Sequence, residues 1–213
     1  MWSAGRKGDR ALLENLTVEG IRAGIRPIDM LFGFAGPFLV KIGELWACGD
    51  LTVSDEHSFT YACEGVIDVI SEKTETEFNL GKGLDGNSSG VLANIPGNDH
   101  HLGLRFVKLA LASEGVKTSL LTKPASVEQI LDKALSEECH FIGLSISMPS
   151  QLESLEKCLM VIDRESSFTG SVIVGGGAVK RQEIIKKDAF RLDIKYMTNP
   201  NFDKKEIQDL IKL

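Results

Sequence analysis

The second half of the chain alternates short apolar runs with amphipathic stretches, and this alternation limits the fold more than any other feature. The runs have strand length and lie at 91–95, 118–122, 141–145, 171–174 and 194–196. Helical periodicity follows each run, in stretches that end at 114, cover 127–135 and 151–162, begin at 179 and cover 204–211. Strands joined by helical crossovers pair in parallel. We therefore expect an α/β fold over residues 91–213, with an open, doubly wound sheet of five parallel strands.

The first 73 residues follow another pattern, with apolar side chains at steps of three and four. Pro27 suits the first turn of a helix, whereas Pro37 should kink or divide the apolar stripe that contains it. Ser54 is the predicted N-cap of a further helix, with acidic residues in its first turn. We expect a helical bundle over 1–73 and a polar, glycine-rich linker over 74–90.

Length, composition and charge exclude several classes of protein. The chain has 213 residues, of which 43% are hydrophobic and 25% charged, and its net charge is −6. These values exclude a disordered chain or a coiled-coil rod, and the lack of a basic excess argues against direct nucleic-acid binding. No apolar run approaches the ~20 residues of a membrane span, and the charged N-terminal residues argue against a signal peptide. Four widely spaced cysteines without a CxxC pair favour free thiols in the reducing cytoplasm.

The loop after the first predicted strand carries the residues best suited to hold a ligand. They are Gly97, Asn98, Asp99, His100, His101 and Gly103. Ligands of open parallel sheets bind at the carboxyl ends of the strands, where an imidazole can contact a metal or a substrate. The glycines would let a large flat ligand approach the backbone. Polar capping of the following helix is the alternative explanation.

The loops after the third and fourth predicted strands carry hydroxyl groups and glycines. Ser145 and Ser147 could bind a ligand heteroatom, and Gly175, Gly176 and Gly177 would let the backbone lie against a planar or phosphate-bearing group. Helix capping by the serines and an ordinary tight turn are the alternatives. The glycines form neither a dinucleotide fingerprint nor a Walker loop. Because all three loops end parallel strands, together they favour one shared site.

The helical part adds Trp46 and, after nine intervening residues, the pair Glu56 and His57. Trp46 ends one predicted helix and the pair begins the next, so a short hairpin would bring the three side chains together. A core tryptophan beside a surface Glu-His pair is the alternative. The chain shows no nucleophile elbow with a Ser-His-Asp pattern, which argues against a hydrolase.

Together these motifs resemble the cobalamin-binding module. That family carries Asp-x-His-x-x-Gly, Ser-x-Leu and Gly-Gly motifs on a flavodoxin-like domain, which a helical bundle usually precedes. The spacing of Trp46 and the Glu56-His57 pair is most similar to that of the light-sensing cobalamin-binding regulators of the CarH, LitR and AerR types. The resemblance covers about residues 9–200.

The resemblance implies a role for each motif. His100 matches the histidine that replaces the cofactor's own dimethylbenzimidazole as lower ligand of cobalt. The displaced nucleotide tail would pass Ser145 and the Gly175-Gly176 turn. The cap over the upper face of the corrin would consist of Trp46, Glu56 and His57.

Three positions depart from the family pattern. Asn98 replaces the family's aspartate, so this residue can fix the tautomer of the imidazole but adds no charge to it. Ser147 replaces the leucine of Ser-x-Leu. Ala47 stands where the best-known light-sensing members have a histidine that captures cobalt after photolysis, so such a state would need His57, His101 or another donor.

The resemblance leaves three hypotheses. The first is a cytoplasmic, non-enzymatic cobalamin sensor that regulates transcription through a partner protein. We expect no DNA-binding domain before the module. The chain would then resemble the stand-alone members of the family, or such a domain has been removed from it. The second is a corrinoid carrier subunit of a methyltransferase system, and the third is a relative that holds haem or no metal. The sequence leaves open the upper ligand (adenosyl, methyl or hydroxo), the partner and whether the chain forms a homo-oligomer.

Overall fold

The structure is a computed structural model that describes residues 2–78, 88–179 and 189–197. The chain divides into two compact units, Met1–Lys82 and Gly83–Leu213, and each is described by itself. Within the described ranges no helix has the length and apolarity needed to cross a membrane.

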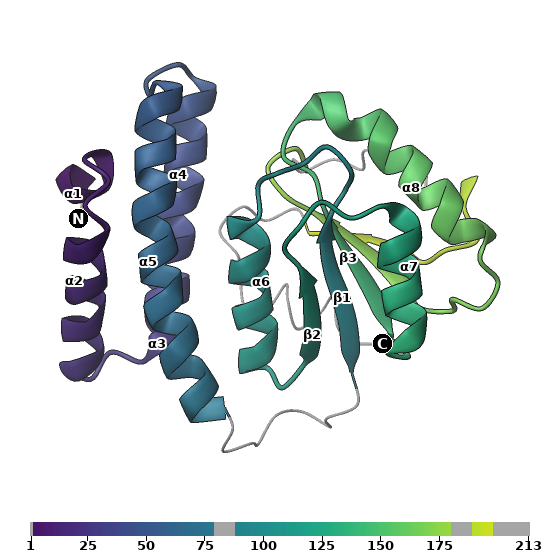
Figure 1. Cartoon of the computed structure of the whole chain (residues 1–213), viewed down its shortest axis with the longest axis horizontal. Coiled ribbons are helices and arrows are strands. Elements are labelled where there is room, and N and C mark those ends of the chain that lie inside the picture. The colour runs from purple at the N-terminus through teal and green to yellow at the C-terminus, as the bar shows by residue number, and fades with distance from the viewer. Residues whose placement is uncertain (1, 79–87, 180–188, 198–213) are drawn as a thin grey trace. The chain divides into compact units, whose positions relative to one another are not determined.

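The first unit is helical, as predicted (Figure 1). Its helices are α1 (Trp2–Arg6), α2 (Arg10–Arg22), α3 (Pro27–Met30), α4 (Gly36–Ala47) and α5 (Val53–Phe78), with a π-helical turn at Leu31–Ala35. Pro37 lies in the first turn of α4, directly after the π-helical turn, so it divides the apolar stripe as expected.

Both ends of α5 differ from the prediction. The N-cap is Thr52 and not Ser54, because the Thr52 hydroxyl accepts the backbone N–H of Asp55 while the Asp55 carboxylate accepts the backbone N–H of Thr52. The helix also continues to Phe78, into the stretch predicted as linker. The helical part of that stretch contains Glu75 and Glu77, a residue type that favours helix as well as solvent.

The aromatic core of the first unit holds the α4–α5 hairpin together. Phe59 of α5 is fully buried, and its ring centroid lies 4.6 Å from that of Trp2 and 5.7 Å from that of Phe38. These contacts join α1 and α4 to α5. The hairpin that carries Trp46 and the Glu56-His57 pair is thus anchored by aromatic packing.

The second unit has the predicted five-stranded parallel sheet. Its described elements are β1 (Ser89–Asn94), α6 (Leu102–Ser113), β2 (Lys117–Leu121), α7 (Val127–Ser136), β3 (Phe141–Ser145), a 3₁₀ turn at Pro149–Gln151, α8 (Leu152–Arg164), β4 (Ser171–Gly175) and β5 (Ile194–Tyr196). The strand order is β2-β1-β3-β4-β5, and every neighbouring pair is parallel. The predicted helices from 179 onwards and over 204–211 fall outside the described residues.

Helices cover both faces of the sheet, with α6 on one face and α7 and α8 on the other (Figure 1). The main core lies between the sheet and the α7–α8 layer, where alternate strand residues such as Val91, Ile142 and Val172 are fully buried. The connections leave β1 and β3 in opposite directions along the sheet. A doubly wound sheet has its ligand crevice at the carboxyl ends of such a strand pair.

The four cysteines are free, as expected. Cys48 is exposed, whereas burial raises the pKa of the Cys63 thiol to about 12 and that of Cys158 to about 11. The two buried thiols therefore act as small apolar core groups and not as nucleophiles.

Candidate functional site

The ends of three strands lie side by side at one edge of the sheet. Asn94 of β1 is in register with Ser145 of β3, which is in register with Gly175 of β4. The loops that follow these residues are the three that sequence reasoning assigned to a shared site. The structure brings them together, and ligand binding by their individual residues stays a prediction.

Asn98 joins the β1 loop to the end of β3. The side chain is buried, with only 2% of its surface exposed. Its Nδ2 donates to Asn94 Oδ1 at 3.1 Å and to the Ser145 carbonyl at 2.9 Å. These two acceptors fix the orientation of the amide, because a flipped amide would set Oδ1 against the Ser145 carbonyl.

The fixed amide in turn orients His100. Asn98 Oδ1 accepts the backbone N–H of His100 at 3.2 Å and lies 3.1 Å from the ring Nδ1. Since this oxygen can only accept, the neutral ring carries its proton on Nδ1 and its lone pair on Nε2. His100 is exposed, so Nε2 can bind a group that approaches from outside. The contact fits the expectation that Asn98 fixes the tautomer of the imidazole, and the ligand role of His100 stays a prediction.

The other polar residues of the β1 loop are placed differently. His101 directly precedes α6, and its Nδ1 lies 3.3 Å from the carbonyl of Asp99. Asp99 is exposed, and His101 is half-buried. The contact with Asn98 selects His100 as the candidate metal ligand of the two neighbouring histidines.

Sequence reasoning missed Gln151, which ties two of the loops together. Its Oε1 accepts the backbone N–H groups of Ser147 at 2.8 Å and Met148 at 3.0 Å. Its Nε2 donates to the carbonyl of Gly97 at 3.0 Å. Gln three residues after Met148 fits a helix-capping pattern, which could have revealed the bonds to its own loop. The bond to Gly97 crosses 54 residues and leaves no local signal.

The glycine turn after β4 is packed directly against the β3 loop. Ile146 donates its backbone N–H to the carbonyl of Gly175 at 2.9 Å. Gly176 has φ +110°, and a Cβ there would lie 2.2 Å from the Ile146 carbonyl oxygen. A Cβ on Gly177 would lie 3.3 Å from the Ser147 carbonyl oxygen. Close packing of two loops therefore explains Gly176 without a ligand.

The two glycines of the β1 loop differ from Gly176, because no described atom lies within 4 Å of a Cβ built on Gly97 or Gly103. Gly97 needs its freedom for a φ of +85°. Gly103 lies at the start of α6, with open space around the position of its Cβ. This open space is where a broad ligand could approach the backbone.

An apolar cavity lies below these loops, between α6 and the sheet. Residues that line it include Leu92, Leu104, Val107, Gly143, Ser145 and Ile173. A Cβ on Gly143 would lie 2.5 Å from Leu92 Cδ2, so this glycine keeps part of the space free. The cavity begins at the same strand ends that carry the loops.

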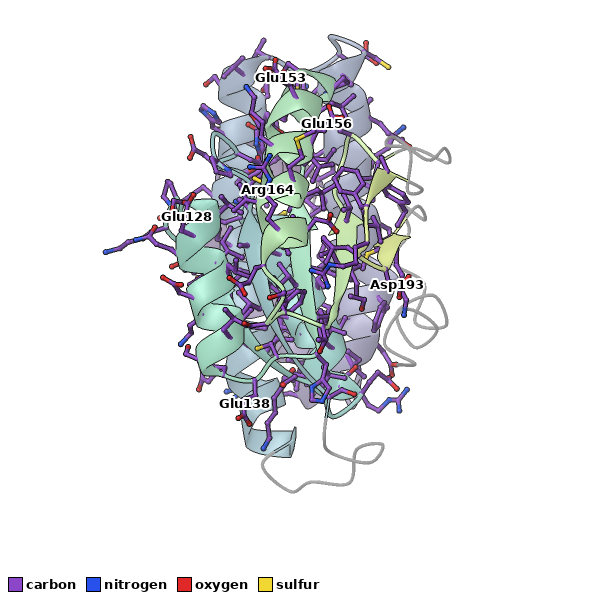
Figure 2. The ribbon with its side chains drawn as sticks, turned by 90° about the vertical axis from the view of Figure 1, so that its right-hand side faces the viewer. Glu128, Glu138, Glu153, Glu156, Arg164 and Asp193 are labelled. Carbon is purple, nitrogen blue, oxygen red and sulfur yellow. The ribbon has the colours of Figure 1, made fainter. Side chains whose placement is uncertain are left out.

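The opposite face of the unit, formed by α7 and α8, presents mainly acidic side chains to solvent. Figure 2 shows them on this face: Glu128, Glu138, Glu153, Glu156 and Asp193, with Arg164 among them. Lys133 and Lys157 of the same helices pair with Glu137 and Glu153.

The predicted cap residues flank the α4–α5 turn of the first unit. Trp46 is half-buried in the last turn of α4. Glu56 is half-buried and accepts the Thr60 hydroxyl at 2.7 Å. The His57 side chain is 74% exposed, with its Nε2 3.6 Å from Glu56 Oε2. One hairpin carries all three residues, as expected, and their role as a cap stays a prediction.

Comparisons with known proteins identify a family and a fold. Two family models match, both described as a B12 binding domain, over residues 88–197 and 1–71. A curated relative, the HTH-type transcriptional repressor CarH of Myxococcus xanthus, is 26% identical over 168 residues, which are 79% of this chain and 54% of the relative. The chain thus spans about half the length of that relative. The monomethylamine corrinoid protein of Methanosarcina barkeri has the same fold, with a TM-score of 0.79 at 14% identity over 99% of this chain and 95% of that one.

The contact between Asn98 and His100 predicts a tautomer that can be measured. In Asn98→Ala the ring loses its acceptor, so we expect the Nδ1–H tautomer of His100 to lose its dominance in ¹⁵N NMR spectra. Loss of the buried amide should also lower the free energy of unfolding by about 1–3 kcal/mol. Asn98→Asp keeps an acceptor for the ring but loses the donation to the Ser145 carbonyl, so it should retain the Nδ1–H tautomer while it also lowers the free energy of unfolding. An unchanged tautomer in Asn98→Ala would contradict this geometry.

The contacts of Gln151 predict that two helix-capping glutamines differ in their effect on amide exchange in the loop over 96–101. Gln129 accepts the backbone N–H of Ser126 at 2.9 Å within its own turn, whereas Gln151 also reaches Gly97. Gln129→Met and Gln151→Met both remove a capping bond. We expect only Gln151→Met to speed amide exchange in the loop over 96–101, followed by hydrogen-exchange mass spectrometry. Equal amide exchange of this loop in the two variants would show that the hydrogen bond between Gln151 and Gly97 does not restrain the loop.

Proposed function

The chain belongs to the B12-binding domain family, and from this premise we propose that it is a cobalamin sensor whose cobalt is ligated from below by Nε2 of His100. Loss or exchange of the upper axial ligand in light would be its signal. The protein would regulate transcription in the cytoplasm through a partner protein and would not act as an enzyme. The single observation that carries the proposal is the orientation of His100 by the buried amide of Asn98.

The side chains available as metal ligands suit a metal ion that a macrocycle already binds. Among the described residues, no three His, Cys, Asp or Glu side chains are grouped closely enough to hold a bare metal ion. One imidazole suffices where a ring already supplies the equatorial nitrogens, and neutral imidazole is a good ligand for cobalt. When bound, a cobalamin would supply a cobalt–carbon bond that light can break. No described atom lies within 4 Å of a Cβ built on Gly103, three residues after His100.

The apolar cavity favours cobalamin over haem. Ligation by His100 would displace the cofactor's nucleotide tail, and the displaced tail needs its own buried space. The cavity between α6 and the sheet starts at Ser145 and Gly175, at the strand ends that also carry the loop with His100. Haem has no nucleotide tail and gives no reason for this cavity.

Two observations favour a sensor over a corrinoid carrier. The similarity to the CarH repressor extends over 79% of this chain. The spacing of Trp46 and the Glu56-His57 pair resembles that of light-sensing members, and a closed cap would hinder a carrier, whose upper face must open to its partners. The corrinoid carrier is the second candidate, because the monomethylamine corrinoid protein has the same fold.

The proposed function can be tested by loading and illumination. Purified protein is incubated in the dark with adenosyl- or methylcobalamin, desalted and exposed to green light, with hydroxocobalamin, which has no cobalt–carbon bond, as the control. We expect retained pigment whose absorption changes to a new stable spectrum, with a change of assembly state or partner affinity. Retained pigment that is stable to light, but reducible and methylated by a partner methyltransferase, would support the carrier instead. A protein that retains no cobalamin would refute both.

The role of His100 is tested by two neighbouring substitutions. His100→Ala should leave the fold intact, because the side chain is exposed. We expect it to shift the spectrum of the loaded protein from histidine-ligated to water- or base-ligated cobalt. His101→Ala is the matched control and should keep the histidine-ligated spectrum. The opposite result for the two variants would assign the ligand to His101.

A further inference from the structure

We propose that His140 is a pH-sensitive switch that holds the first residue of β1 when its ring is neutral and releases it when the ring is protonated. That residue is Ser89, which lies shortly after the boundary between the two units at Lys82 and Gly83. The switch would therefore set the point at which the connection between the units ends. It acts without a bound cofactor and lies at the end of the sheet opposite to the candidate site.

The backbone N–H of Ser89 has an unusual acceptor. The carbonyl of Ser89 accepts the backbone N–H of His140 at 2.8 Å, so a regular parallel ladder would pair the Ser89 N–H with the carbonyl of Glu138. This N–H donates instead to Nδ1 of the His140 ring, at 3.2 Å. A side chain that can titrate thus replaces a backbone carbonyl, which cannot.

The conformation of Glu138 explains this replacement. Its φ is 50°, in the left-handed region, because the chain leaves α7 there, and β3 begins only at Phe141. The Ser89 hydroxyl lies 3.5 Å from the Glu138 carbonyl and 3.2 Å from Nδ1 of His140. The imidazole therefore has both a backbone donor and a hydroxyl within reach of the same ring nitrogen.

The neutral and the protonated ring make different hydrogen bonds with Ser89. Because Nδ1 of the neutral ring accepts the backbone N–H, the ring carries its proton on Nε2. A further proton, taken from water, would occupy Nδ1 and leave the Ser89 N–H without this acceptor. The new Nδ1–H can donate to the Ser89 hydroxyl. Protonation thus exchanges a bond that holds the backbone for one that holds only a side chain.

The ring is open to solvent, and charges of both signs surround it. His140 is exposed, so water can deliver the proton directly. The titratable and charged side chains on the elements around it are Lys117 beside Ser89 on β2, the preceding Glu138 and Cys139, and Arg191, Asp193 and Lys195, which line the same recess. Burial raises the pKa of the Cys139 thiol, so this group stays neutral, and Asp193 pairs with Lys195. The hydrogen bond from Ser89 is therefore the contact that distinguishes the two states of the ring.

The test follows the full chain by NMR from about pH 8 to about pH 5, a range that contains the ordinary titration of an imidazole. At the upper end we expect ¹⁵N shifts of the Nε2–H tautomer for His140, the opposite of the tautomer expected for His100. As the pH falls, the Ser89 amide signal should move together with the ring signals of His140. Its exchange, relative to the intrinsic rate at each pH, should rise by about two- to tenfold. An Nδ1–H tautomer of His140, or a Ser89 amide that does not follow the ring, would overturn the proposal.

Three substitutions separate the switch from general effects of pH. In His140→Asn, Oδ1 can take the place of Nδ1 and does not titrate, so the Ser89 amide should stay held across the range. In His140→Ala the amide should be released at both ends of the range. His57→Asn removes another exposed histidine, in the first unit, and is the matched control that should respond like the unmodified chain.

Thermal melting reports any general loss of stability in these variants. A Ser89 amide that responds to pH in His140→Asn as it does in the unmodified chain would assign the response to another group and overturn the proposal. The titration of the unmodified chain stands without any of the variants.

Discussion

The hydrogen bond between the Asn98 amide and the Ser145 carbonyl is the contact on which the site depends. It crosses the crevice between β1 and β3 and fixes which end of the amide faces His100. An ionised carboxylate has no proton to donate to that carbonyl. Asn98 therefore combines two functions, since it holds the two loops together and sets the imidazole tautomer. This gives a structural reason for an amide where the family pattern has an acid.

The sheet could be predicted because its signals are local and repeat along the chain. The bounds of β3 and β5 agree with those expected from sequence. β1 starts earlier than expected, at Ser89, because Ser89 pairs with Lys117 and Gly90 with Phe141. Neither residue favours a strand by itself, so pairing with neighbouring strands decided the boundary.

The site was predictable in its loops but not in the contacts that organise it. Strand order places the three loops at one edge, and alternation along the chain suffices to predict that edge. Gln151 and Asn94 act through side-chain bonds whose partners are set by the folded loops. Ser54 and Thr52 both fit the residue preference of an N-cap, and only the reciprocal bonds with Asp55 identify Thr52. Trp46, Glu56 and His57 stay predictions as a cap.

The central claim is that Nε2 of His100 is the lower ligand of a bound cobalamin. The most direct measurement is the electron paramagnetic resonance spectrum of protein loaded with cob(II)alamin, prepared once with natural nitrogen and once with ¹⁵N-histidine. Ligation by histidine predicts that the three-line nitrogen splitting of the natural sample becomes a two-line splitting after labelling, and that His100→Ala loses this response. A three-line splitting that persists after labelling would show that the cofactor's own base remains on cobalt, and would contradict the account.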